Sequence, residues 1–362
     1  MTGSRIHLAP LALAAAFVLA GSLHAAGPRD SLKKGSPKLQ SISALAFGPE
    51  GILFIGDARA AAIVALDTQD YPETASTDLP KVESLDEKIA SLLGIEASQL
   101  VFNALAVNPR SGNTYLGVTR GKGAGSTPVL LRVNRAGKLS EVALKDVPFA
   151  HTALPNPGKG RQPGDVITHM AYLKGKLYVA CLSNEEFASR FRVLSFPFKD
   201  ADKGTGVEIF HGSHNRVETK SPIRTFVPYQ VKGEENILAA YTCTPLVQIP
   251  VASLKAGEKV RGKTIAELGN HNRPLDMIVY QKDGKDYILM ANSSRGVMKI
   301  PTEGIDKAEA ITKGVKETAG LKYETIKSLA GTEHLDAFDK DHALVLIRTP
   351  DKKLNLQTIE MP

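Results

Sequence analysis

The sequence predicts an all-β fold made of six similar modules. Short apolar segments rich in Val, Ile, Leu and Ala recur in groups of three, separated by turns that contain Gly or charged residues. The groups begin roughly 50 to 65 residues apart, which is typical of a repeat architecture with inserted loops. A helical pattern stands out at one place in the chain. These three observations favour a ring of β-modules over a layered α/β fold.

Each module is expected to contain an apolar strand, a tight turn, a second strand, a polar loop and a third strand. The predicted strands are 44–47, 52–55 and 62–66; 104–107, 114–118 and 129–133; 169–172, 176–180 and 191–196; 225–229, 237–241 and 246–249; 276–279, 287–290 and 296–300; and 336–338, 343–347 and 354–359. Because a neighbouring module must cover the apolar face of each one, we predict a closed six-bladed β-propeller. A two-sheet sandwich is the alternative, and segments around 139–147 and 325–329 could contribute to a seventh blade.

A short helical insertion is predicted between the first two modules. Ser84 and Glu87 have the spacing of a capping box, and Gly94 is placed to end the helix. One face would carry four apolar side chains, Leu85, Ile89, Leu92 and Leu93. We expect this helix to pack over the outside or the mouth of the ring between the first two blades.

The N-terminal segment predicts export. Residues 1–25 contain one cation, Arg5, and an apolar run of about 13 residues that is followed by small residues, as in a secretory signal peptide. The run is shorter than the roughly 20 residues that cross a bilayer, although an uncleaved anchor is the alternative. We therefore expect a signal peptide at 1–25, a flexible linker at 26–40 and the propeller domain at 41–362, in the periplasm or outside the cell.

Charge and cysteine content limit the partners. The chain has 45 Lys and Arg against 38 Asp and Glu, a net charge of +7 that is only mildly basic and does not indicate nucleic-acid binding. Its two cysteines, Cys181 and Cys243, are compatible with a disulfide or with two separate buried thiols, and metal ligation ranks behind both. A role for Cys243 with nearby histidines in electron transfer ranks behind the other functions.

The segments 45–55 (LAFGPEGILFI) and 105–113 (LAVNPRSGN) resemble the six-bladed propellers of the NHL and SMP-30 type. In any propeller, the loops that enter the inner strands and the loops that follow the second strands surround the mouth of a central channel, where a ligand site is expected. Lactonases of the SMP-30 type have a Glu metal ligand at the start of the first inner strand, where this chain has Ser43 or Ala44. Asn103 lies at a comparable position in the second blade.

Arginines gather in the loops that a propeller places around its mouth. Four follow second strands and two precede or begin inner strands: Arg59, Arg120, Arg295 and Arg348, and Arg224 and Arg273. A ring of guanidinium groups would bind a carboxylate, phosphate or sulfate through charge-assisted hydrogen bonds. The alternative is that these arginines are solvated or pair with nearby carboxylates, namely Asp57, Glu185, Asp276 and Asp336.

The loop entering the fourth module carries a second candidate site. His211, His214 and Glu218 could bind a divalent metal if the loop curls, leaving a position open for water. Three further histidines precede or begin inner strands and could face the mouth: His169, His271 and His334. The chain contains no nucleophile elbow, phosphate loop or haem attachment motif.

The sequence therefore predicts a periplasmic or secreted propeller that binds an anionic or polar small molecule, or a partner protein, on its loop-rich face. The alternative is a metal-dependent hydrolase or lyase, similar to SMP-30 lactonases, with its site at the channel mouth. No motif decides whether the protein is an enzyme.

Overall fold

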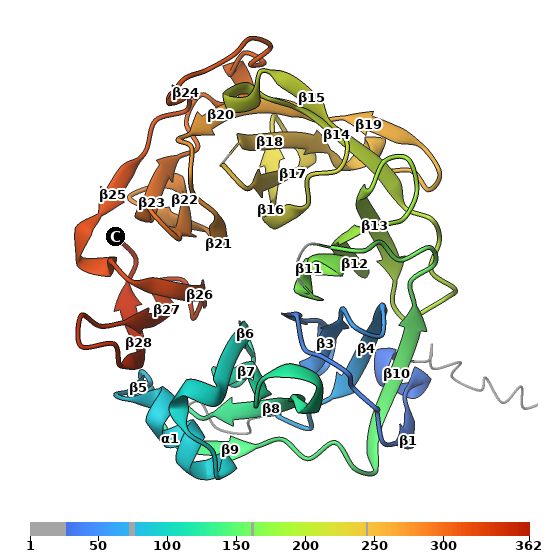
Figure 1. Ribbon diagram of the computed structural model, residues 1–362, viewed down its shortest axis with the longest axis vertical. Helices are drawn as coiled ribbons and strands as arrows, with labels where there is room; N and C mark the ends of the chain where they lie inside the picture. Colours follow the sequence, from blue (N-terminus) through green and yellow to red (C-terminus); the bar gives the residue numbers. More distant parts are fainter. Residues whose placement is uncertain (1–26, 72–76, 161–162, 244) are drawn as a thin grey trace, which may run out of the picture.

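The computed structural model describes residues 27–71, 77–160, 163–243 and 245–362, and it shows six β-sheets arranged radially around a common centre (Figure 1). This confirms the predicted six-bladed β-propeller. The predicted signal peptide lies outside the described residues. No helix in the described ranges has the length and apolar character needed to cross a membrane.

Blades are numbered here in chain order, and the inner strand of each comes first. Blade 1 contains β2 (Ala44–Phe47), β3 (Ile52–Asp57), β4 (Ala62–Asp67), β10 (Val147–Ala153) and β1 (Lys33–Gly35); blade 2 contains β6 (Leu100–Val107), β7 (Thr114–Arg120), β8 (Thr127–Val133) and β9 (Leu139–Glu141). Blade 3 contains β11 (Ile167–Leu173), β12 (Lys176–Leu182), β13 (Ser189–Ser195), β14 (Thr205–His211) and β15 (Arg216–Glu218), with β19 (Lys259–Arg261) parallel to β14. Blade 4 contains β16 (Ile223–Val231), β17 (Glu234–Tyr241), β18 (Pro245–Pro250), β20 (Lys263–Leu268) and β24 (Thr318–Gly320). Blade 5 contains β21 (Pro274–Lys282), β22 (Lys285–Asn292), β23 (Gly296–Pro301) and β25 (Glu324–Ile326); blade 6 contains β26 (Thr332–Ala337), β27 (His342–Arg348), β28 (Leu354–Glu360) and β5 (Lys81–Val82).

The first three strands of every blade overlap the predicted segments, although the inner strands of blades 2 to 6 begin two to four residues earlier than predicted. Each of these strands pairs antiparallel with the next. The segments considered for a seventh blade instead supply outer strands. Residues 139–147 include β9 and begin β10, and residues 325–329 overlap β25. These short strands extend existing sheets, so the described chain forms six blades.

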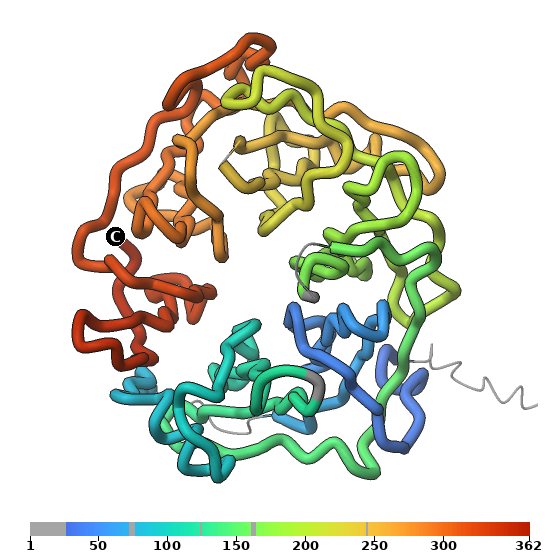
Figure 2. Tube along the Cα trace, in the orientation of Figure 1, coloured from blue at the N-terminus to red at the C-terminus, as the bar shows by residue number. Residues whose placement is uncertain are grey.

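The blades are not arranged in chain order. The inner strand β2 of blade 1 contacts β6 of blade 2 on one side and β11 of blade 3 on the other, while β6 contacts β26 of blade 6. Six apolar clusters lie at the corresponding blade interfaces, including one between blades 1 and 3 and one between blades 2 and 6. The order around the ring is therefore 2, 1, 3, 4, 5, 6. Figure 2 shows the segment after blade 2 passing outside blade 1, where β10 pairs with β4.

A strand from the N-terminal half closes the ring. The two-residue β5 lies between blades 1 and 2 in the sequence, yet it pairs with β28 as the outer strand of blade 6. Val82 of β5 is 4% exposed and belongs to the apolar cluster between blades 2 and 6. Burial of its side chain and pairing of its backbone thus join the last blade to the early part of the chain.

The predicted helix is α1 (Leu85–Leu93), but its position and cap differ from the expectation. It packs in the cluster between blades 2 and 6, because β5, which directly precedes the helix, pairs with β28 of blade 6. Ser84 has left-handed backbone angles and its side chain makes no capping hydrogen bond; its backbone N–H donates to Asn355 Oδ1 at 2.9 Å. Leu92 is 48% exposed, whereas Gly94 ends the helix in a left-handed conformation as predicted.

The expected linker is held against blade 1 in the structure. Its residues include a 3-10 turn, η1 (Pro28–Ser31), and β1, which pairs with β10. The Arg29 guanidinium lies 3.7 Å from the centre of the Tyr71 ring and donates to the Glu50 carbonyl oxygen. The other 3-10 turns are η2 (Pro49–Gly51), η3 (Ala97–Gln99), η4 (Gly123–Gly125), η5 (Pro163–Val166), η6 (Gly212–His214), η7 (Val251–Ser253), η8 (Ile305–Lys307) and η9 (Lys327–Leu329).

Candidate functional site

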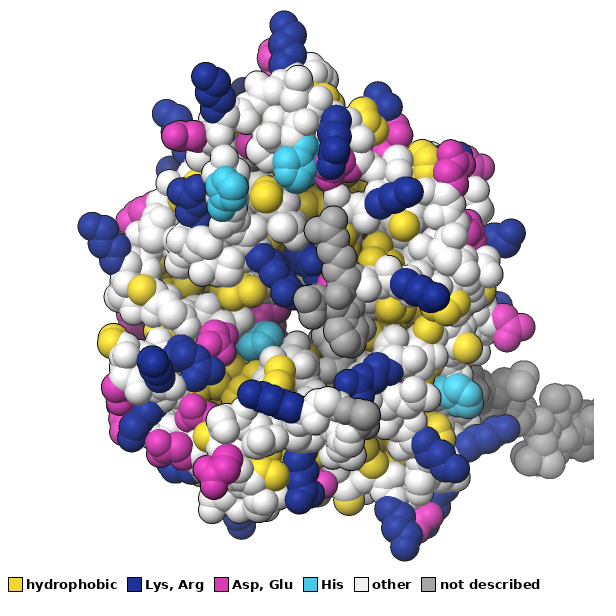
Figure 3. Space-filling model, in the orientation of Figure 1, with side chains coloured by type: hydrophobic (Ala, Val, Ile, Leu, Met, Phe, Trp, Pro, Cys, Tyr) yellow, Lys and Arg dark blue, Asp and Glu magenta, His cyan; other side chains and the backbone are white. Residues whose placement is uncertain are grey.

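A cavity of about 710 Å³ lies at the mouth of the central channel. All six blades line it, through the starts of their inner strands and the loops near them: Ser43, Asn103, Thr168, Arg224, Asp276 and His334 represent blades 1 to 6. Figure 3 shows basic, acidic and histidine side chains around this central opening. A concave site with convergent polar groups is the ordinary form of a ligand-binding site.

Three of the six arginines considered above line this cavity, and they differ in their partners. Arg224 is paired with Asp165, at 2.5 Å between Nη1 and Oδ1, and its Nε donates to Thr242 Oγ1. Arg59 donates to Ser126 Oγ at 3.2 Å. The Arg273 guanidinium makes no hydrogen bond or ion pair with any residue that the structure describes.

Arg273 is a cation in an unfavourable environment. Burial lowers the pKa of its guanidinium, and the nearby positive charge of Arg224 lowers it further, while Asp165 and Asp276 act in the opposite direction. Because Asp165 is paired with Arg224 and Asp276 with His334, the mouth keeps a cation that a ligand anion can neutralise.

A carboxylate–imidazole pair occupies the same cavity. His334 Nδ1 lies 2.8 Å from Asp276 Oδ2, which also accepts a hydrogen bond from the Leu335 N–H. Burial opposes the charged imidazole, but the attraction and hydrogen bond of Asp276 outweigh it and raise the pKa of His334. Burial lowers the pKa of His169, whose ring packs edge-on against Phe226. The cavity thus contains one histidine whose pKa is raised and one whose pKa is lowered.

The other predicted arginines do not line the cavity. Arg348 is held by Glu333, with Nε–Oε1 at 2.5 Å and Nη2–Oε2 at 3.1 Å, and it also faces Asp86. Arg295 lies over Gly269 and donates to the Asn270 carbonyl oxygen. Arg120 is the last residue of β7 and is exposed. Arginines at equivalent positions in the blade loops therefore differ in where their side chains point.

The carboxylates suggested as partners of these arginines are engaged elsewhere. Asp57 accepts from Gln40, Ser41 and Ala60, and Glu185 pairs with Arg190. Asp336 accepts hydrogen bonds from the backbone N–H groups of Val107 and Ala337. Asp165 and Glu333, which do pair with arginines of the predicted set, were not among the expected partners.

The loop with two histidines curls as the metal hypothesis requires, but Glu218 takes a different place. Its Oε2 lies 3.0 Å from His211 Nδ1 and its Oε1 lies 2.7 Å from His214 Nδ1. Burial alone would raise the pKa of Glu218, but hydrogen bonds from His211, Ser221 and His214 outweigh it and lower the pKa well below the usual range. Glu218 therefore orients both imidazoles, and neither histidine lines the mouth cavity.

Cys243 completes the cluster from the neighbouring blade. One potential ligand atom from each of His211, His214 and Cys243 lies within 4.8 Å of the other two. Cys243 is half-buried in the turn after β17, and its backbone N–H donates to the Asn272 carbonyl oxygen. The sequence signal for this contact is weak, because the cysteine is far along the chain from both histidines and only blade packing brings them together.

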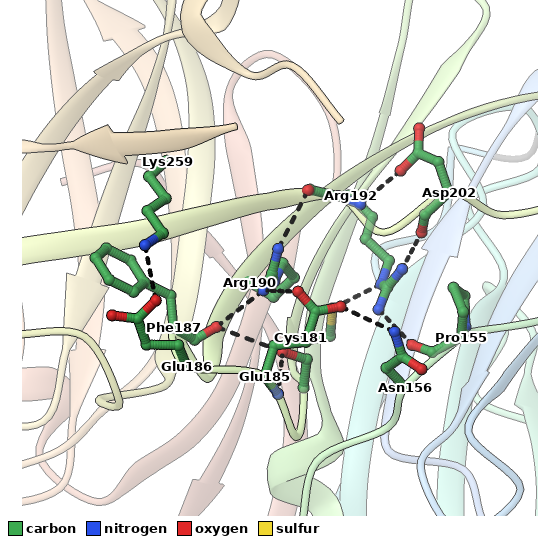
Figure 4. Close-up of polar contacts among 12 residues, drawn as sticks. Pro155, Asn156, Cys181, Glu185, Glu186, Phe187, Arg190, Arg192, Asp202 and Lys259 are labelled. Carbon is green, nitrogen blue, oxygen red and sulfur yellow. Dashed lines mark hydrogen bonds and ion pairs between the residues drawn. The ribbon is translucent and has the colours of Figure 1, made fainter. Parts of the chain in front are cut away.

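Cys181 is not part of this cluster. Both cysteines are free in the structure, but only Cys181 is buried and Cys243 is half-buried, so the expectation of two buried thiols holds for Cys181 alone. Cys181 is buried in blade 3, where Arg192 Nε donates to its sulfur at 3.4 Å and burial raises the pKa of the thiol (Figure 4). Arg192 also donates to the carbonyl oxygens of Pro155 and Asp202, so this network holds loops together.

The fold defines the protein as a six-bladed β-propeller. No protein-family model matches the sequence, and no curated protein matches it significantly. A solved structure from Thermus thermophilus, described as a putative oxidoreductase (glucose dehydrogenase), is similar over 91% of this chain and 100% of its own, with 14% identity and a TM-score of 0.34. The WD40 β-propeller domain of Doa1 is similar over 91% of this chain and 96% of its own, with 7% identity and a TM-score of 0.33.

Proposed function

We propose that this propeller binds a small organic anion, carrying a carboxylate or phosphate group, in the cavity at the channel mouth. The observation that carries the proposal is the state of Arg273. Its guanidinium lies near that of Arg224 and has no ion pair among the described residues. A bound anion would satisfy its fork of N–H donors and relieve the repulsion from Arg224.

The dimensions and remaining groups of the cavity suit such a ligand. Its volume of about 710 Å³ lies within the roughly 300–1,000 Å³ of small-molecule sites. Arg59 supplies a further cation, and Asn103 and Thr168 supply polar groups. Protonated His334 would add positive charge, so we expect the anion to bind more tightly as the pH falls through the raised pKa of His334.

Substitution of Arg273 tests the proposal. We would measure thermal stabilisation by citrate and by inorganic phosphate for the unsubstituted protein, for Arg273→Gln and for a control, Arg295→Gln, which lies outside the cavity. Loss of a charge-assisted hydrogen bond of about 1.5–3 kcal/mol should weaken binding by roughly 10-fold to 150-fold in Arg273→Gln. Equal stabilisation of all three proteins by both anions would contradict the proposal.

We also propose that the protein works in the periplasm or outside the cell, with residues 1–25 removed on export. The sequence pattern of a charged start, an apolar run and small residues supports this location. N-terminal sequencing of protein recovered from periplasmic and culture fractions tests it, and an intact N-terminus in the cytoplasmic fraction would contradict it.

A further inference from the structure

Three side chains with metal-binding chemistry meet where blade 3 packs against blade 4. His211 ends β14, His214 ends the 3-10 turn η6, and Cys243 follows β17. Their potential ligand atoms lie within 4.8 Å of one another. Donor atoms around tetrahedral zinc lie roughly 3.5 Å apart, so the three need to approach by about an ångström. The exposed side chain of His214 and the turn position of Cys243 leave room for that movement.

Glu218 fixes the orientation and the protonated nitrogen of both imidazoles. A carboxylate accepts hydrogen bonds, so each Nδ1 at 2.7–3.0 Å from Glu218 carries the proton and each Nε2 keeps its lone pair. Ser221 and Arg216 also donate to Glu218 and fix its orientation. A carboxylate behind the histidine ligands is the usual support of a protein metal site.

The buried side of the cluster contains polar atoms without hydrogen-bond partners in the part of the chain that the structure describes. His211 is 2% exposed, and its Nε2 has no hydrogen-bond partner among the described residues. Two atoms close to His211, Ser213 Oγ and Glu267 Oε2, are also buried and have no hydrogen-bond partner among the described residues. An unpartnered buried group costs about 1–3 kcal/mol, so a ligand on His211 Nε2 would remove a penalty that the folded protein otherwise carries.

We infer that His211, His214 and Cys243 form a binding site for a single thiophilic transition-metal ion, zinc or copper, supported by Glu218. A thiolate and two imidazoles favour these ions over magnesium or calcium, which prefer oxygen ligands. Binding converts the Cys243 thiol to a thiolate, and its proton passes to solvent. Three protein ligands leave one coordination position for water or a small ligand.

The proposed metal site is separate from the anion site but close to it in the chain. Thr242, next to Cys243, accepts the hydrogen bond of the Arg224 side chain at the mouth cavity. Arg273 contributes nothing to the metal cluster. Arg273→Gln should therefore keep its metal affinity, and failure of one proposal leaves the other standing.

Metal titration of chelator-treated full-length protein tests the site. Zinc and copper binding would be measured by calorimetry and elemental analysis, with cobalt as a probe, because cobalt bound to thiolate gives a charge-transfer absorption band. We expect one equivalent of metal and displacement of cobalt by zinc. Cys243→Ser should abolish the band, and His214→Gln, at an exposed side chain, should weaken affinity at least tenfold without loss of folding.

Matched variants separate this site from adventitious binding. Cys181→Ser and His151→Gln remove a thiol and an exposed imidazole elsewhere, and both should keep one equivalent and an unchanged band. Glu218→Gln should weaken binding roughly 10-fold to 100-fold while the ligands remain. Absence of stoichiometric metal in the folded protein, or a band that survives Cys243→Ser, would overturn the inference.

Discussion

Asp336 is expected to make the propeller less stable as the pH rises towards neutrality. Its carboxylate accepts from the Val107 N–H at 2.8 Å and so joins blade 6 to blade 2. Burial raises its pKa from 3.8 to about 7, with a further contribution from Asp276, although the backbone N–H groups of Val107 and Ala337 oppose the shift. Between these two values the folded state holds a proton that the unfolded chain has released. Stability therefore falls as the pH increases.

The size of this effect follows from the pKa difference. A shift from 3.8 to about 7 is roughly three units, which at 1.36 kcal/mol per unit corresponds to at most about 4 kcal/mol of stability lost between pH 4 and 8. Asn in place of Asp336 resembles the protonated carboxyl group and does not titrate. Asp336→Asn should therefore gain stability relative to the unsubstituted protein as the pH rises over this range.

Urea denaturation at constant ionic strength, from pH 4 to pH 8, measures the difference. Asp339→Asn is the control, because backbone and His342 hydrogen bonds overcome burial and lower the pKa of Asp339, so its contribution has the opposite sign. Parallel stability profiles for Asp336→Asn and the unsubstituted protein would show that Asp336 does not cause the loss of stability.

Two further predictions concern how the ring is held together. Val82→Asp would place an unpaired charge in the buried contact of β5 with blade 6. We expect urea denaturation to show a loss of about 3 kcal/mol in the free energy of unfolding. The exposed control Lys81→Ala should change that free energy by less than about 0.5 kcal/mol. Equal stability of both variants would mean that β5 does not contribute to closure. Gly117→Ala should cost about 1–3 kcal/mol by overpacking, because an added Cβ would lie 2.3 Å from Ile42 Cγ2, and an unchanged melting temperature would contradict that close contact.

The blades could be predicted because the signal for their first three strands is local. Apolar runs separated by Gly-containing turns, such as residues 44–47 and 52–55, specify antiparallel pairing with the next strand. The outer strands lack this signal. The two residues of β5 pair with β28 and β10 pairs with β4, each across a long stretch of sequence. Blade order was equally hidden, because every blade interface is formed by apolar side chains, and burial of apolar surface does not specify which blade becomes the neighbour.

The candidate sites could be predicted by residue type more readily than by partner. Arginines were considered as ligands at the mouth, and Arg59, Arg224 and Arg273 line the cavity there. Arg348 instead forms an ion pair with Glu333 and does not line it. Metal binding by the histidine loop was made conditional on a curl of that loop, and the structure shows the curl. The side chain that faces the imidazoles from blade 4, Cys243, was not among the predicted ligands. Contacts between blades depend on packing across the ring, which spacing within one loop does not encode.

The exchange of outer strands has a consequence for synthesis on the ribosome. Blade 1 cannot complete its main sheet until β10, after the whole of blade 2, has emerged, and β5 awaits a partner strand that is made last. Nascent chains must therefore carry open sheet edges through almost the entire period of translation. For the same reason, removing or duplicating one contiguous repeat in this half of the gene would disturb two sheets at once.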